Sequence, residues 1–212
     1  MDVIDSLDRV RTEHDVLAHR FYTRWSAGEL SRGELGVYAG QYRHAVCALA
    51  EASELAAREA PAGMREGLEH HAEEERDHVA LWDAFAAACG GEKDTPALAE
   101  TAGCAERWTA GSDLLERLAV LYAIEASQPG ISRTKLEGLR DHYAFVQEGP
   151  ATGYFSLHAV RDVEHADAAA ELIRALMAAE SDPEAKAAAM VAAAERALRG
   201  NWELLDGVEA AS

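Results

Sequence analysis

Three side chains that can bind a metal stand at helical spacing in the last third of the chain. His158, Asp162 and His165 occupy positions i, i+4 and i+7, so on an α-helix their directions fall within an arc of about 60°. Two imidazoles and a carboxylate that converge on one face suit iron, manganese or zinc. A single histidine is usually a satisfied polar group, but the three together predict a metal site.

A second set with the same spacing lies within residues 70–78, His-His-Ala-Glu-Glu-Glu-Arg-Asp-His. Here His71, Glu75 and His78 stand at i, i+4 and i+7. Glu75 and His78 also form a Glu-x-x-His pair, the unit that carboxylate-bridged di-metal helical proteins use. Glu74 is an alternative ligand because it lies four residues before His78. The other acidic residues of this helix are expected to be solvated.

A third carboxylate, Glu125, ends the apolar stretch of residues 118–125. Burial of an unpaired carboxylate is costly, so Glu125 is either a ligand that bridges two metals or the partner of Arg133 or Lys135 in a salt bridge. With Glu125 as a ligand, three helices would provide three carboxylates and at least three histidines. Such a set suits a di-iron, oxygen-activating centre better than a structural zinc with four closed ligands.

The elements that must position these residues are predicted to be all helical. Glycine and proline fall mainly between segments of helical period, and alternating β-branched runs are almost missing. We expect one domain of about seven to eight helices over residues 1–212. The predicted helices cover residues 3–25, 31–59, 64–89, a shorter one from Thr95-Pro96, 113–127, 132–146, 152–180 and about 183–205. Ser31 and Glu34 form a capping box, and Gln128-Pro129-Gly130 is expected to end a helix.

Charge and composition exclude several classes of partner. The 212 residues carry a formal net charge of −18, which disfavours nucleic acid and anionic membranes. No apolar stretch is long enough to span a bilayer, and the chain starts without a signal-like segment, so we expect a cytoplasmic protein. Cys47, Cys89 and Cys104 are widely spaced and lack a CxxC pair, which favours buried, reduced thiols.

Residues 154–165, together with residues 125–139, closely resemble the heme-oxygenase-like di-metal oxidases of the TenA/PqqC superfamily. Within that superfamily the similarity is strongest to the para-aminobenzoate synthases. The aromatic motifs at residues 21–31, 38–42 and 78–82 fit the same pattern, so the resemblance extends over about residues 21–172. It implies a heme-oxygenase-like helical bundle.

The resemblance also implies a set of metal ligands. The family's ligands fall on His78, Glu125, His158, Asp162 and His165, with one further glutamate from the third helix. The para-aminobenzoate synthases place that glutamate seven residues before the histidine, where this chain has His71. Other members of the superfamily use Glu-x-x-His, so Glu75 is the preferred ligand, with His71 and Glu74 in reserve.

The chemistry implied by the resemblance uses two iron ions, or iron with manganese, with O2 as co-substrate and an external reductant. In the para-aminobenzoate synthases a protein tyrosine is oxidised and excised as the product, and a lysine is thought to supply the amino group. Tyr22 and Lys135 match those positions. Tyr154, one turn before His158, is a second candidate tyrosine or a radical relay. Taken alone, each of these tyrosines could equally be a core residue.

Other functions fit the same residues. A di-iron N-oxygenase or C–C-cleaving oxidase would act on a small amine or amino-acid-like substrate, since one fold serves many reactions. A metal-binding helical protein without turnover is a further alternative. A TenA-like hydrolase is disfavoured because none of the three cysteines lies in a matching motif. Heme-oxygenase-like bundles often pair through helix faces, so the resemblance also suggests a homodimer.

Overall fold

The computed structural model describes residues 2–145 and 148–211, and all regular structure within them is helical. The all-α prediction is therefore confirmed. Among these residues there are nine α-helices and one short 3-10 helix, in the order α1 (Val3–Glu13), η1 (Val16–Ala18), α2 (Arg20–Ala27), α3 (Arg32–Glu59), α4 (Ala62–Cys89), α5 (Ala99–Thr109), α6 (Leu114–Glu125), α7 (Gln128–Asp141), α8 (Gly153–Met177) and α9 (Pro183–Ala210).

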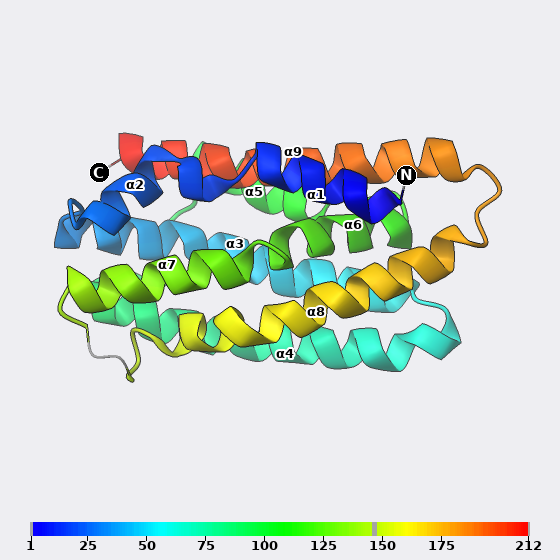
Figure 1. The fold of residues 1–212 in the computed structure, drawn as a ribbon. Coiled ribbons are helices and arrows are strands. Elements are labelled where there is room, and N and C mark those ends of the chain that lie inside the picture. The colour runs from blue at the N-terminus through cyan, green and yellow to red at the C-terminus, as the bar shows by residue number, and fades with distance from the viewer. Residues whose placement is uncertain (1, 146–147, 212) are drawn as a thin grey trace.

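The long helices run side by side as a bundle (Figure 1). Helices α3 and α4 form an antiparallel pair, α9 packs on α5 and α6, and α8 packs on α7, α6 and α4. Helices α1, α2 and α9 lie on one side of the bundle, and α4 and α8 lie on the opposite side (Figure 1). Because α8 contacts both α4 and α6, the three helices that carry the predicted metal ligands are neighbours.

Local sequence signals explain several helix ends. The backbone N–H of Glu34 donates to the Ser31 hydroxyl at 3.2 Å, and the N–H of Ser31 donates to the Glu34 carboxylate at 2.7 Å, which is the predicted capping box of α3. Gly90 ends α4 in the left-handed region with φ 79°, a conformation that glycine adopts without a steric penalty. Both boundaries agree with the sequence prediction.

The predicted helix over residues 3–25 is wrong as a single element. The Asp15 side chain accepts from the N–H of Leu17 at 3.0 Å and starts η1, and His19 Nδ1 accepts from the N–H of Phe21 at 3.0 Å and starts α2. Such side-chain to backbone hydrogen bonds offer the chain an alternative to a continuous helix. The resulting break gives one more helix than the eight predicted segments.

Two other predicted boundaries are also wrong. Helix α5 begins at Ala99 and not at Thr95-Pro96, because the Thr95 hydroxyl donates to the Glu92 carbonyl, and Gln41 donates to the Pro96 carbonyl. The segment from Gln128 starts α7, since a proline in the first turn loses no helical hydrogen bond. Helix α7 ends at Asp141, and the predicted end at Val146 lies outside the described residues.

The interior contains an aromatic cluster and an aliphatic cluster. Trp25, Tyr38 and Trp82 belong to the first, and Leu7 and Leu118 belong to the second. The three cysteines are free, as the sequence predicted, but only Cys89 and Cys104 are buried and Cys47 is half-buried. No helix in the described part of the chain is long and apolar enough to cross a membrane.

Gly138 allows α7 to lie against α2. A Cβ atom at this position would stand 2.3 Å from Nε1 of the buried Trp25. We therefore expect Gly138→Ala to lower the free energy of unfolding by about 1–3 kcal/mol through overpacking. The control is Gly103→Ala in α5, where no atom lies within 4 Å of the added Cβ and helix propensity favours alanine. Urea unfolding of both variants measures the difference, and equal stabilities would contradict this account.

Candidate metal centre

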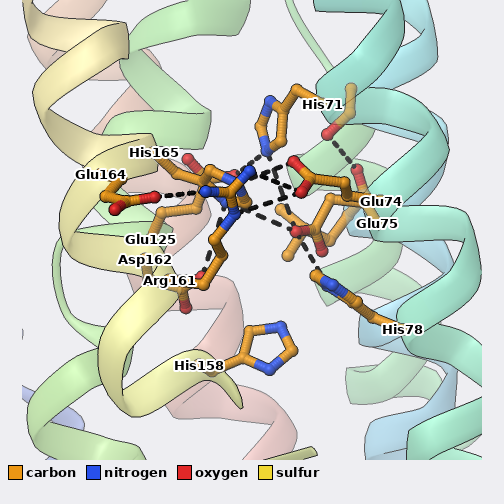
Figure 2. A network of polar contacts seen from close by, with 12 residues as sticks. His71, Glu74, Glu75, His78, Glu125, His158, Arg161, Asp162, Glu164 and His165 are labelled. Carbon is orange, nitrogen blue, oxygen red and sulfur yellow. Dashed lines mark hydrogen bonds and ion pairs between the residues drawn. The ribbon is translucent and has the colours of Figure 1, made fainter.

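Helices α4, α6 and α8 bring the predicted metal ligands together in the interior (Figure 2). The i, i+4, i+7 spacing on α4 and on α8 keeps each set on one helix face, and Glu125 reaches the same space from the end of α6. All but one of the seven side chains are buried, and His71 is half-buried. They are His71, Glu75 and His78 from α4, Glu125 from α6, and His158, Asp162 and His165 from α8.

Two groups of potential ligands share one carboxylate. The first group contains His71, Glu75, Glu125 and His165, and the second contains Glu75, His78 and His158; within each group the ligand atoms lie within 4.8 Å of one another. Glu75 is in both groups because it lies between His71 and His78 on the same face of α4. Glu125 had been predicted to bridge two metals, but in the structure it belongs to the first group only.

The donor atoms of this cluster face mainly one another. His71 Nε2 lies 2.8 Å from Glu125 Oε1, and His78 Nδ1 lies 3.1 Å from Glu75 Oε1. Of the 15 buried side-chain polar atoms without a hydrogen bond of good geometry in the described structure, ten belong to these seven residues. Buried polar atoms without partners are costly. Imidazole nitrogens and carboxylate oxygens are also ligands that suit iron and manganese. The residues present therefore fit a pair of divalent metal ions.

Hydrogen bonds at the back of two imidazoles fix which nitrogen faces the cluster. His158 Nδ1 donates to the Tyr154 carbonyl at 2.7 Å, which leaves Nε2 free. His165 Nε2 donates to the Glu74 carboxylate at 3.2 Å, which leaves Nδ1 free. Outer partners of this kind orient metal-bound histidines. Each of these two histidines thus presents one lone pair to the interior.

Glu74, one of the two reserve ligands, lies behind His165 and belongs to neither group of ligands among the described residues. Arg161 donates to it twice, from Nε at 3.1 Å and from Nη2 at 2.6 Å, and also pairs with Glu164 (Figure 2). Partial burial opposes ionisation of Glu74, but Arg161 and His165 outweigh it and lower the pKa of its carboxyl. The other reserve, His71, lies inside the first group. Arg161 could not be predicted from the sequence, because an arginine on an acidic helix face gives no signal of its own.

Burial and neighbouring charges shift the pKa values of three side chains of the cluster. Burial, with the charges of Glu125 and Glu75, raises the pKa of Asp162 to about 10. Burial lowers the pKa of His71, but the neighbouring carboxylates outweigh it and raise that pKa to about 9. Burial lowers the pKa of His158 to about 4. Asp162 is close to the first group, with Oδ1 3.7 Å from Nδ1 of His165.

The predicted catalytic residues lie next to the second group, where tyrosine rings pack around Lys135. We call Lys135 and these rings the aromatic chamber. Lys135 is 1% exposed, and its Nζ lies over the rings of Tyr22 at 5.6 Å, Tyr38 at 5.1 Å and Tyr42 at 4.8 Å. Tyr154 stacks on His158 with ring centroids 3.8 Å apart. The structure therefore places Tyr22 beside Lys135, and Tyr154 between this chamber and the cluster.

The model of a family described as iron-containing redox enzymes matches residues 37–201. This chain belongs to that family. Two curated relatives are both 4-aminobenzoate synthases. The protein from Chlamydia trachomatis is 30% identical over 205 residues, which cover 86% of this chain and 84% of that one. The protein from Nitrosomonas europaea is 29% identical over 227 residues, covering 95% and 89%.

Solved structures confirm the fold of this iron-containing redox enzyme. A domain of unknown function with a heme-oxygenase-like fold from Shewanella denitrificans has a TM-score of 0.82 and 18% identity, and the match covers 100% of this chain and 93% of that one. A TenA homologue from Pseudomonas syringae has a TM-score of 0.83 and 17% identity, with 98% and 91% covered. The predicted heme-oxygenase-like bundle is therefore correct.

Glu74 should support metal binding without being a ligand. We expect Glu74→Ala to weaken binding of one metal ion by about 10- to 100-fold, because His165 loses the partner that orients it. The matched control is Glu73→Ala, its exposed neighbour on α4. Titration of metal-free protein with Mn²⁺ or Co²⁺ measures the affinities. Equal affinities of the two variants would show that Glu74 does not act through His165.

Metal binding should release protons from the cluster. At pH 7 the metal-free protein holds a proton on His71 and one on Asp162, because both pKa values lie well above 7. If both residues become ligands, binding expels about two protons, and apparent affinity rises with pH until both groups ionise unaided. Calorimetry of Zn²⁺ binding in buffers of different ionisation enthalpy counts them. Asp162→Asn should release one proton fewer, and no release from wild type would contradict this ligand set.

Proposed function

We propose that this protein is an O2-activating di-metal oxidase that forms 4-aminobenzoate by oxidising its own Tyr22. The observation that carries the proposal is the position of the buried Lys135 and tyrosine chamber against the second group of ligands. The 4-aminobenzoate synthases among its relatives support this reading. The resemblance of Tyr22 and Lys135 to the tyrosine and lysine of those enzymes supports it further.

The seven side chains of the cluster would hold two iron ions, or one iron and one manganese, and Glu75 belongs to both groups of ligands. Once reduced by an external reductant, such a pair would supply the electrons that activate O2. The chain itself fixes the ligands through the hydrogen bonds behind His158 and His165. It also keeps bulk water away, since the residues of the second group are all buried.

The chamber suits a reaction between a phenol and an amine. Burial holds the pKa of Lys135 well below its usual range, which favours the neutral, nucleophilic amine. Burial also raises the pKa of Tyr22, so its phenol stays protonated until it is oxidised. The Tyr38 hydroxyl lies 3.4 Å from the Tyr22 hydroxyl and is its hydrogen-bond partner. Tyr22 would supply the ring of the product, and Lys135 would supply its nitrogen.

An aromatic path leads from the cluster to this chamber. Tyr154 stacks on His158, and Trp82 meets the Tyr154 ring edge-on with ring centroids 4.9 Å apart. The Tyr42 ring lies 5.1 Å from the Trp82 ring and is tilted by 32° to it. Trp82 also lies 5.9 Å from the ring of Tyr38. Tyr154 is therefore proposed as a relay for oxidation of Tyr22, in preference to being the precursor of the product itself.

The second candidate function is oxidation of an external amine or amino-acid-like substrate by the same centre. A cavity next to the first group favours it, because a self-sacrificing reaction needs no room for a substrate. An N-oxygenase and a C–C-cleaving oxidase both fall within this class.

Formation of 4-aminobenzoate without added substrate tests the proposal. The protein is expressed with iron, its metal is quantified, and it is reduced and exposed to O2. We expect less than one 4-aminobenzoate per chain, because each chain carries a single Tyr22. Tyr22→Phe should abolish the product while retaining the metal. The matched control is Tyr122→Phe. The Tyr122 hydroxyl donates to Asp8, away from the chamber, so its loss should leave the yield of 4-aminobenzoate unchanged.

Two other results would argue against self-sacrifice. If wild type binds two metals and forms no 4-aminobenzoate, the oxidases of external substrates remain. If Tyr22→Phe still forms the product, another tyrosine is the precursor. A wild-type protein that binds no metal would remove the basis of both functions.

A further inference from the structure

A cavity of about 630 Å³ opens beside the first group of ligands, between α4, α6 and α8. His71, Glu125 and His165 line it. No residue of the chamber around Lys135 lines it, so the cluster faces a buried chamber on one side and this cavity on the other. The volume falls in the range of about 300–1,000 Å³ found for sites that bind small molecules.

The walls of the cavity are mainly apolar. Leu68 from α4, Leu118 and Leu121 from α6, and Leu172 from α8 line it. Gly67 adds space on α4, because a Cβ there would meet no atom within 4 Å. At the cavity, Glu125 is 1% exposed, and its Oε1 lies 2.8 Å from Nε2 of His71, which also lines the cavity. The cavity thus joins apolar surface to the paired polar groups of the centre.

Charged residues of the lining carry more negative than positive charge. Away from the ligands, Glu74, Glu164 and Glu171 lie there with a single guanidinium, Arg161, so this rim has a net charge of −2 (three carboxylates against one cation). The three ligand carboxylates would offset most of the charge of two divalent ions, so the rim is the negative part of the lining. Arg161 is already paired with Glu74 and Glu164 (Figure 2). The whole chain is also strongly acidic, with a formal net charge of −18. This rim therefore attracts a cation and repels a carboxylate.

We propose that this cavity binds a primary amine with an apolar body, as an external substrate of the metal centre. The ammonium group lies among the rim carboxylates, and the apolar body extends along Leu68 and Leu121 towards Glu125. This inference rests on the proposed di-metal centre and names the class of substrate that the centre would take. It requires no change in the buried chamber around Lys135.

Binding of three probes of equal length tests the charge preference. The protein is loaded with Zn²⁺, which does not activate O2, and titrated by calorimetry with hexylamine, 1-hexanol and hexanoate. We expect one hexylamine per chain, weaker binding of hexanol and the weakest binding of hexanoate. Hexanoate binding as tight as hexylamine, or no binding of any probe, would overturn the proposal.

Paired variants test the place of binding. Gly67→Leu adds a side chain at the cavity and should weaken hexylamine at least tenfold, whereas Gly103→Leu, also a helix-interior glycine with open space around it, should not. The double variant Glu164→Gln/Glu171→Gln should weaken hexylamine roughly threefold to tenfold and should not weaken hexanoate. The control for this double variant is Asp77→Asn, which removes an exposed charge of α4 outside the cavity and should leave hexylamine binding unchanged.

Zinc content separates this inference from the proposed function. If the wild type holds two zinc ions and binds no hexylamine, the cavity is not an amine site, and the di-metal proposal stands. If the protein binds hexylamine and no metal, the cavity is an amine site, and the proposed di-metal centre is wrong. Equal effects of Gly67→Leu and Gly103→Leu would place hexylamine outside this cavity.

Discussion

The organisation of the interior depends on the burial of carboxylates and imidazoles whose main polar neighbours are one another. His71 pairs with Glu125, and His78 pairs with Glu75, yet ten side-chain atoms on α4, α6 and α8 lack a hydrogen bond of good geometry in the described structure. A buried polar atom left unsatisfied costs about 1–3 kcal/mol, which is a large share of the roughly 5–15 kcal/mol by which a domain is stable. Protons relieve part of this cost, since the pKa values of Asp162 and His71 are raised. Bound metal cations would relieve more of it, because one cation would bind several of these atoms together.

The same cluster gives the protein two unlike environments. On one side His158 is held by the backbone of Tyr154, and the aromatic rings beyond it enclose a lysine that has lost its solvation. On the other side His165 is held by Glu74, which Arg161 anchors at the edge of an open cavity. A centre between them would face protein side chains in one direction and a cavity in the other. Both proposed functions, self-sacrifice and oxidation of an external substrate, depend on this arrangement.

The sequence predicted the parts of this arrangement that lie within single helices. The i, i+4, i+7 spacing on α4 and α8 identifies faces that the structure brings together, since that spacing is a property of the helix itself. Which carboxylate lies near both groups of ligands depends on the rotation and separation of neighbouring helices, which the sequence does not give. In the structure Glu75 belongs to both groups and Glu125 to one, and bridging by Glu125 stays a prediction. The position of Glu74 was undetermined for the same reason, because its partner Arg161 lies on another helix. The break before α2 was missed since Asp15 and His19 act as caps only in their local backbone conformation.

If the seven side chains hold the metals, the ligand set of this chain differs from the one that the resemblance to the para-aminobenzoate synthases implies, in a way that preserves charge. His71 stands where the resemblance implies a glutamate, and Glu75 one turn later would supply the carboxylate. With Glu125 and Asp162, the number of carboxylates around two divalent cations would stay at three. The additional imidazole is the most exposed member of the cluster and lines the cavity. The substitution therefore changes the side of the centre that faces the cavity, and leaves the side that faces Tyr154 and Lys135 as it is. A difference in chemistry between this protein and its relatives would arise at the first group of ligands.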